Sequence, residues 1–332
     1  MPLILFASPK GGVGKTTLVA NVADALRREG RPVLALDLDP QNSLRLHFGV
    51  PLQDGGGYMA NLLQKPDWRA ALRPTVSGVT LLPHGAIELR QVLEQAVALE
   101  RDPALLAGPL REMLADPRLL VLADLPPGPS HTLAVAAPLA SLIVTVLQSE
   151  AISAAMLGEV ESGRFLGGGT QAALQAGRLQ FLLNGVDLGA RLSRAAAEAV
   201  ARHLGPRLLG AVSQDVMLAE ALAQLRLIYD LAPGAAAAED LRQIARSLAQ
   251  LLPAPAIAAA APPAFAAPPA TPIATLAARP TAGPAAAPAI AAGATPISPP
   301  AAPPAAPAAP VAAEPPAAPR FGLAQSPFWG GR

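Results

Sequence analysis

Lys10-Gly11-Gly12-Val13-Gly14-Lys15-Thr16-Thr17 combines three glycines with two lysines and two threonines in eight residues. It follows a short apolar run at residues 3–7 and opens a segment, residues 16–29, whose apolar side chains recur at helical spacing. A glycine-rich turn between a buried strand and a helix lets successive backbone N–H groups converge on phosphate oxygens, with the positive end of the helix behind them. The stretch therefore predicts a phosphate-binding loop.

The side chains of this loop indicate which phosphates it holds. Lys15 is expected to contact the β- and γ-phosphates, and Thr16 to ligate Mg²⁺ through its hydroxyl. Thr17 is expected to hold the α-phosphate through its backbone or hydroxyl. The predicted ligands are therefore ATP and Mg²⁺. The loop residues expected to bind nucleotide are Gly11, Gly12, Val13, Gly14, Lys15, Thr16 and Thr17.

From the first residues onward, short apolar runs alternate with helical segments. This rhythm predicts an α/β fold, a P-loop NTPase with a doubly wound, mostly parallel sheet of about seven to eight strands. The expected strands are residues 3–7, 33–36, 79–82, 119–123, 142–147, 179–183 and 208–212. Beyond the helix that follows the loop, the expected helices are 87–115, 150–163, 190–204, 216–226 and 238–251.

Composition divides the chain near residue 252. More than half of its 38 prolines lie beyond that point, in an alanine- and proline-rich stretch with almost no charge. Such a stretch buries too little apolar surface to offset the entropy of ordering it. We expect an ATPase domain at 1–252 and a disordered linker at 253–320. Residues 321–332 concentrate three aromatic residues and are expected to form a docking peptide. The alternative is that these last residues are a disordered end without function.

Composition also excludes several classes of function. The chain has no cysteine, so disulfides and thiolate metal sites are excluded. A net charge of +1 provides no strong pull toward DNA or anionic lipid. No run of about 20 strongly apolar residues appears. The four histidines lack the paired spacing of a metal site. We expect a cytoplasmic protein without direct membrane insertion, for which DNA binding is not favoured.

Polar residues close several of the predicted strands. Asp37 and Asp39 follow the second strand, Asp124 ends the strand at 119–123, and Asn184 closes the strand at 179–183. In open α/β sheets, ligands collect at the carboxyl ends of the strands. We therefore expect these side chains to face the nucleotide. Turn formation is the alternative for Asp39, Asp124 and Asn184.

With its two lysines, the loop resembles that of the deviant Walker family of ParA and MinD type ATPases. The resemblance implies that Lys10 reaches across a homodimer to the phosphates of the partner's ATP. It also implies that Asp39 positions the attacking water, that Asp37 lies near the metal, and that Asp124 holds Mg²⁺ through water.

Three further segments carry functional resemblances. Asn184 resembles the family's adenine-reading asparagine. Residues 213–215 occupy the place of a loop around the base, with serine in place of the usual proline, so backbone contacts are expected there. The strand and Pro-Pro-Gly turn at 120–128 resemble the second switch, in which the Gly128 N–H could donate to the γ-phosphate and move when that phosphate leaves.

Residues 44–50, 67–69 and 81–85 are similar in order and spacing to those of the BcsQ (YhjQ) family of cellulose-synthase accessory ATPases. The resemblance implies an ATP-sandwich homodimer that helps assemble or localise the bacterial cellulose synthase complex. Its partners would be proteins of that complex and small accessory subunits. Through these partners it would be recruited to the inner membrane or the cell pole.

Three other functions remain open. A ParA-like partitioning ATPase would use a basic surface for nonspecific DNA binding, with arginines available between residues 178 and 207. A MinD-like membrane switch needs an amphipathic basic C-terminal helix, for which the tail contains too much proline. A non-enzymatic adaptor is disfavoured by the complete set of Lys10, Lys15, Thr16, Asp39 and Asp124.

Overall fold

The structure is a computed structural model of the 332-residue chain, and it describes residues 2–150, 157–162 and 176–252. The linker at 253–320, the docking peptide at 321–332 and half of the helix expected at 150–163 lie outside the described residues. Among the described residues, no helix combines the length and apolarity needed to cross a membrane.

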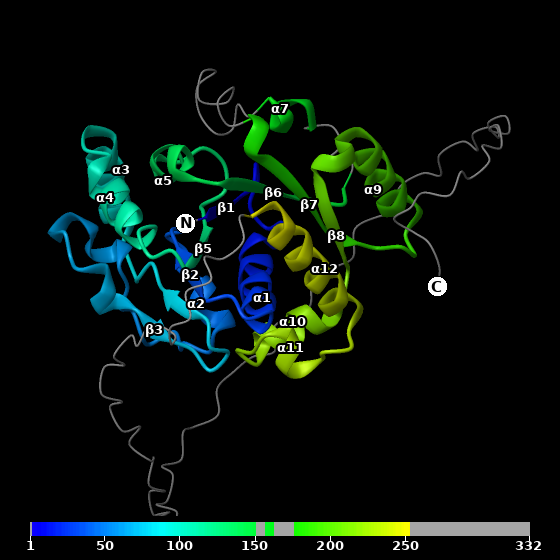
Figure 1. Cartoon of the computed structure of the whole chain (residues 1–332), viewed down its shortest axis with the longest axis horizontal. Coiled ribbons are helices and arrows are strands. Elements are labelled where there is room, and N and C mark those ends of the chain that lie inside the picture. The colour runs from blue at the N-terminus through cyan, green and yellow to red at the C-terminus, as the bar shows by residue number, and fades with distance from the viewer. Residues whose placement is uncertain (1, 151–156, 163–175, 253–332) are drawn as a thin grey trace, which may run out of the picture. The chain divides into compact units, whose positions relative to one another are not determined.

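The described strands form one eight-stranded sheet, which confirms the predicted doubly wound α/β fold (Figure 1). Its order is β3-β4-β2-β5-β1-β6-β7-β8, and every pairing is parallel except that of β3 with β4. The strands are β1 (Leu3–Ala7), β2 (Val33–Asp37), β3 (Arg73–Pro74), β4 (Thr80–Leu82), β5 (Leu120–Asp124), β6 (Leu142–Gln148), β7 (Leu179–Val186) and β8 (Leu208–Ser213).

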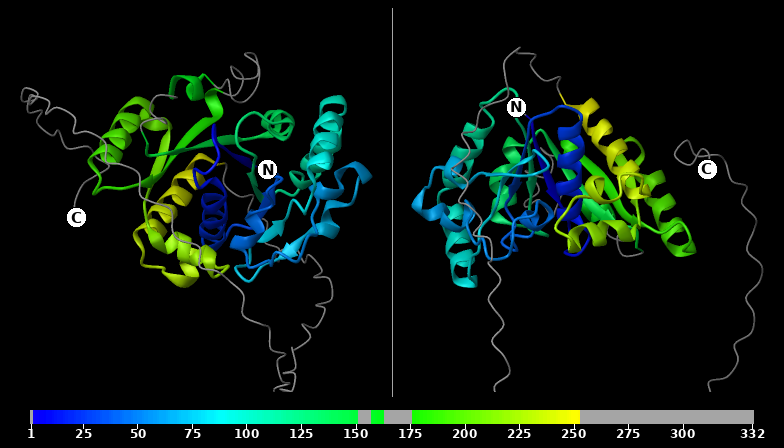
Figure 2. Two further views of the ribbon diagram at one scale, coloured as in Figure 1. Left: turned by 180° about the vertical axis from the view of Figure 1, so that it is seen from behind. Right: turned by 90° about the horizontal axis from the view of Figure 1, so that it is seen from below.

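Helices follow the strands and cover both faces of the sheet (Figure 2). The α-helices are α1 (Lys15–Arg28), α2 (Leu44–His47), α3 (Leu89–Arg101), α4 (Ala104–Met113), α5 (His131–Ala136), α7 (Leu157–Glu161), α9 (Arg191–Leu204), α10 (Val216–Ala223), α11 (Ile228–Leu231) and α12 (Ala236–Leu251). Short 3₁₀ helices include Met59–Gln64 and Trp68–Ala71.

Alternation along the fully buried strand β1 separates two apolar cores. Leu3 and Leu5 belong to the core beneath α3, α4, α5 and α9. Ile4 and Phe6 belong to the core beneath α1 and α12, which lie side by side on the other face (Figure 1). A strand buried on both faces is typical of a parallel sheet, and it explains the continuous apolar run before the glycine loop.

Two details of the predicted elements were wrong. The single helix expected at 87–115 is two helices, because Pro103 lacks a backbone N–H and forces the preceding Asp102 out of helical conformation (φ −135°, ψ 82°). The edge strand β3 was missed, since two residues carry no readable periodicity. The remaining strands begin and end within two residues of their predicted limits, apart from β7, which runs on to Val186.

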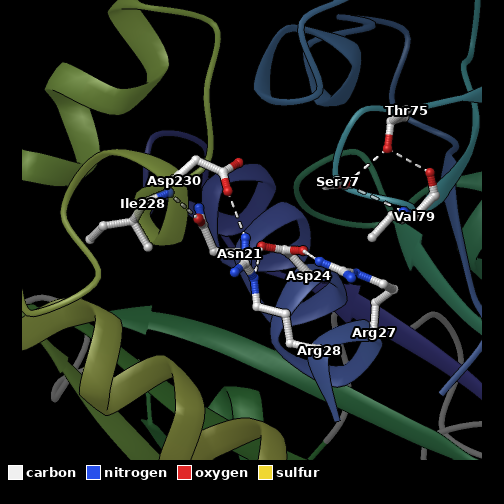
Figure 3. A network of polar contacts seen from close by, with 9 residues as sticks. All are labelled: Asn21, Asp24, Arg27, Arg28, Thr75, Ser77, Val79, Ile228 and Asp230. Atoms are coloured by element: carbon white, nitrogen blue, oxygen red, sulfur yellow. Dashed lines mark hydrogen bonds and ion pairs between the residues drawn. The ribbon is translucent and has the colours of Figure 1, made fainter. Parts of the chain in front are cut away.

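A polar network ties the helix of the glycine loop to α11 (Figure 3). Asn21 donates its side-chain amide to the Thr17 carbonyl at 2.8 Å, and its Oδ1 accepts the Ile228 N–H at 3.0 Å. Asp24 is fully buried, and it pairs with Arg27 at 3.0 Å and with Arg28 at 2.8 Å. The Asn21–Ile228 bond fixes α1, and with it the loop, against α11, whereas the Asp24 pairs lie within α1.

Replacing Asp24 with alanine should destabilise the fold by about 2 to 4 kcal/mol, because the two arginines lose a buried partner but keep partial access to water. Urea unfolding measures this change. Asp230 forms an ion pair with Arg28 at the partly exposed end of the same network. The Asp230→Ala substitution should therefore lower the free energy of unfolding by less than about 1 kcal/mol. Equal losses from the two variants would contradict the assignment of Asp24 as the anchor.

Candidate functional site

The glycine loop follows β1, the strand held between β5 and β6, and it leads directly into α1. Gly12 and Gly14 have φ values of 77° and 81°, in the left-handed region that favours glycine. A Cβ on Gly14 would lie 2.2 Å from the side-chain nitrogen of Asn184. Backbone conformation and close approach therefore both require glycine at position 14.

Lys15, Thr16, Asp39 and Asp124 come together at the carboxyl ends of β1, β2 and β5. Lys15 is buried, and its ammonium forms an ion pair with Asp124 Oδ1 and lies 3.8 Å from Asp39 Oδ2. The Thr16 hydroxyl donates to Asp124 Oδ2 at 2.7 Å. Both carboxylate oxygens of Asp124 are therefore engaged by the residues predicted to bind phosphate and metal.

Asp37 and Asp124 are direct neighbours across β2 and β5, and both are fully buried. Burial raises the pKa of Asp37 well above its ordinary range, and the charge of Asp124 adds to this shift. Burial also raises the pKa of Asp124, against the opposing effects of Lys15 and Thr16. Asp37 accepts the backbone N–H groups of Asp39 and Leu44, at 3.0 and 3.2 Å, and so shapes the turn after β2.

Lys10 stands apart from this cluster. Its ammonium forms an ion pair with Glu150 at 2.7 Å, and 31% of its side chain is exposed. Sequence reasoning missed Glu150, because the pair spans 140 positions and neither residue type nor spacing marks it. The signature lysine therefore lies outside the group that contains Lys15.

In the second-switch segment, Gly128 has a φ of 73°, and its N–H donates to the Ser8 carbonyl at 2.7 Å. This bond ties the segment to the residue that follows β1. The Gly128 N–H predicted to face phosphate is therefore held by the protein's own backbone, and it must leave Ser8 before it can donate to a ligand.

On the side predicted to hold the base, the Asn184 amide donates to the Val13 carbonyl at 2.8 Å. The loop at 213–215 is fixed by bonds to α10 and α12. Ser213 donates its N–H to Asp240 at 2.9 Å, and Asp215 accepts the N–H groups of Met217 and Ala237. Asp215 therefore caps α10, and its carboxylate is occupied by backbone donors.

The oxygen donors of Thr16 and Asp124 suit a hard divalent cation. Mg²⁺ is usually bound by one or two carboxylates together with waters and substrate phosphates, so a cage made only of protein groups is not expected. The described residues contain no group of three or more acidic, histidine or cysteine side chains placed to hold a metal. The Thr16 hydroxyl oxygen and Asp124 Oδ2 lie only 2.7 Å apart. They suit a cation whose coordination is completed by phosphate oxygens.

His47 supports the loop from α2. Its Nε2 lies 3.5 Å from the Thr17 hydroxyl, and only 4% of the residue is exposed. Burial lowers the pKa of His47 to about 4, so the imidazole is neutral at neutral pH.

Because its folded pKa lies below the unfolded value, His47 contributes stability that is complete above about pH 6.5 and lost as the pH falls toward 4. The unfolded chain binds the extra proton in this window. The free energy of unfolding should therefore fall by about 3 kcal/mol more in the wild type than in His47→Gln between pH 7 and pH 4. Equal decreases in the free energy of unfolding of the two proteins between pH 7 and pH 4 would contradict this assignment.

Comparison with known proteins places these features in a family. The family model for "Cellulose biosynthesis protein BcsQ" matches residues 1–248. The BcsQ protein of Salmonella typhi is 34% identical over 148 residues, 41% of this chain and 59% of its own length. The chain thus matches little more than half of that relative.

Two further comparisons extend the likeness over about three quarters of the chain. The chromosome-partitioning ATPase Soj of Thermus thermophilus is 31% identical over 250 residues, which are 74% of this chain and 94% of Soj. The septum site-determining protein MinD of Pyrococcus horikoshii, solved with Mg-ADP, has the same fold, with a TM-score of 0.59, 23% identity, and coverage of 75% of this chain and 96% of its own. The chain belongs to the BcsQ family of cellulose biosynthesis proteins, within the ParA/MinD group of P-loop ATPases.

Proposed function

We propose that this chain is an ATP-dependent switch that dimerises around ATP and supports assembly or localisation of the bacterial cellulose synthase complex. The proposal rests on the different environments of the two lysines. Lys15 is buried against Asp124 and Asp39, whereas Lys10 is partly exposed and free of that cluster. A lysine on the surface beside a phosphate loop is available to a second subunit.

In this proposal each residue has a defined task. The N–H groups of Gly12 to Gly14 and the ammonium of Lys15 hold the phosphates. Thr16 and Asp124 hold Mg²⁺, which neutralises the charge that develops on the phosphates. Asp39 orients the attacking water, and Asp37 keeps the turn that carries Asp39 in place through its two backbone hydrogen bonds. Asn184 reads the adenine from its place beside Val13.

Lys10 joins the site only after it leaves Glu150. This exposed ion pair stabilises the free subunit by less than about 1 kcal/mol, so a phosphate on a partner subunit can compete for the lysine. ATP binding would therefore favour the closed dimer, and hydrolysis would remove the charge that Lys10 contacts. The two states would differ in the surface that they offer to proteins of the synthase complex, which recruit the chain to the inner membrane or the cell pole.

A ParA-like partitioning ATPase remains the second candidate, and the similarity to Soj over 94% of that protein favours it. Arg191, Arg194 and Arg202 lie on α9, although Arg202 approaches Glu198 at 3.9 Å. Retention of the ATP form on DNA, weakened by salt, would support this candidate. Equal retention with and without ATP would count against it.

The Asp39→Ala variant should hydrolyse ATP at least about tenfold more slowly than wild type and remain dimeric with ATP, because it binds the substrate without orienting the water. Lys15→Ala should stay monomeric, since it loses a phosphate contact. Light scattering with and without ATP measures both states. The exposed acid Asp67 lies outside the cluster, so Asp67→Ala is a control that should behave as wild type.

A monomeric Asp39→Ala protein at saturating ATP would overturn the sandwich dimer for this chain. A dimer that forms equally well in Lys15→Ala would show that association does not depend on the phosphate loop, and it would overturn the switch.

A further inference from the structure

Asn42 has an unusual backbone conformation in the turn that carries Asp39. Its φ of 50° lies in the left-handed region, which is disfavoured for most residues with a side chain. The turn is held by bonds on both sides of the residue. The Asn42 N–H donates to the Asp39 carbonyl at 2.8 Å, and the Asn42 carbonyl accepts from Arg45 Nε at 3.1 Å.

Arg45 makes this turn rigid. It is buried, and its Nη1 donates to the carbonyls of Pro51 and Asp54 at 2.5 and 2.7 Å. One guanidinium therefore joins the Asn42 carbonyl to the loop beyond α2. The strained backbone of Asn42 is fixed by its surroundings.

The side chain of Asn42 is buried without partners. Only 4% of the residue is exposed, and neither Oδ1 nor Nδ2 has a hydrogen-bond partner among the described residues. A buried polar group left unpaired destabilises the fold. Unsatisfied polar atoms and strained backbone are found together at functional sites, where a ligand supplies the missing partner.

The carboxylate of Asp39 lies in the same turn and is the acceptor predicted to orient the attacking water. Asp39 Oδ1 accepts the Gln41 N–H at 3.0 Å, and Oδ2 lies 3.8 Å from Lys15 Nζ. A water molecule poised for in-line attack has two protons to donate while its lone pair faces phosphorus. Asp39 can accept one of these protons, and in the same turn Asn42 Oδ1 is an acceptor without a donor among the described residues.

We propose that Asn42 is a further catalytic residue, whose Oδ1 accepts one proton of the nucleophilic water while Asp39 accepts the other. This inference rests on the proposed ATPase function. In the step, the water oxygen bonds to the γ-phosphorus as the bond to the bridging oxygen breaks, and the electron pair stays on ADP. One water proton remains on the released phosphate, and the other leaves through Asp39 to solvent. The Asn42 Nδ2 group donates to a γ-phosphate oxygen.

Two variants separate the amide from the backbone. Asn42→Gly adopts positive φ without strain and removes the amide. Asn42→Asp tolerates positive φ and keeps the acceptor and the stiffness of the turn, but it loses the donor and adds charge facing phosphate. Both should lower kcat for ATP by about tenfold or more, with the KM for ATP and the Kd for ADP within about twofold of wild type.

The melting temperature and the lifetime of the dimer test the proposal independently of turnover. The nucleotide-free Asn42→Gly protein should melt at or above the wild-type temperature, since it loses both the strain and two unpaired buried atoms. With ATP it should remain dimeric for longer than wild type in light scattering. Lys65→Gly is the matched control, because Lys65 has a similar φ of 52° but lines the cavity beside Trp68; its turnover should equal wild type.

Each outcome decides the inference. Wild-type turnover in Asn42→Gly would overturn it. Loss of turnover in Asn42→Gly with wild-type turnover in Asn42→Asp would overturn the donation from Nδ2 to phosphate, because the aspartate keeps only the acceptor. A lower melting temperature in Asn42→Gly with unchanged turnover would assign the amide to a structural water and overturn it too. Absence of ATP hydrolysis by the wild-type chain would instead count against the proposed function itself.

Discussion

The buried ion pair between Lys15 and Asp124 is the interaction on which the candidate site depends. A lysine ammonium and a fully buried carboxylate each cost several kcal/mol to remove from water, and together they recover much of that cost. The pair joins the first turn of α1 to the end of β5, and Thr16 bonds the second oxygen of the same carboxylate. The loop is therefore set against the sheet before any ligand binds.

The order of the strands explains why so few residues suffice. Because β1 lies between β5 and β6, and β2 lies beside β5, the residues that follow these parallel strands meet at one edge of the sheet. Asp37 and Asp124 are neighbours for this reason. The same edge brings Asn184 from β7 against Gly14, where the absence of a side chain leaves room for its amide. The glycine therefore serves packing as well as phosphate access.

Sequence reasoning succeeded where chemistry and structure are local. The glycine loop, the strand before it and the helix after it lie within about 25 residues, and their patterns are readable without knowledge of the rest of the chain. The family resemblance then placed Asp39 and Asp124, which the structure brings beside Lys15. Pro103 could have predicted the break between α3 and α4, because the residue before a proline is disfavoured in helical conformation.

Other features depend on contacts that spacing cannot reveal. The pairing of Lys10 with Glu150 and the approach of Asn184 to Val13 span more than 100 residues. The two-residue strand β3 exists only because β4 offers it a partner. The unpaired amide of Asn42 is visible only after burial and hydrogen bonding are known, since an asparagine after a proline-containing turn is ordinarily exposed.

The central claim is that each nucleotide site is composite, with Lys15 from one subunit and Lys10 from the other. Mixing Lys10→Ala with Lys15→Ala protein tests it most directly, by measuring ATP hydrolysis of each variant alone and of the mixture. In a mixed dimer, the Lys10→Ala subunit keeps its own Lys15 and receives Lys10 from its partner, so one complete site forms. The mixture should regain a substantial part of wild-type activity. Activity no greater than the average of the two inactive variants would contradict it.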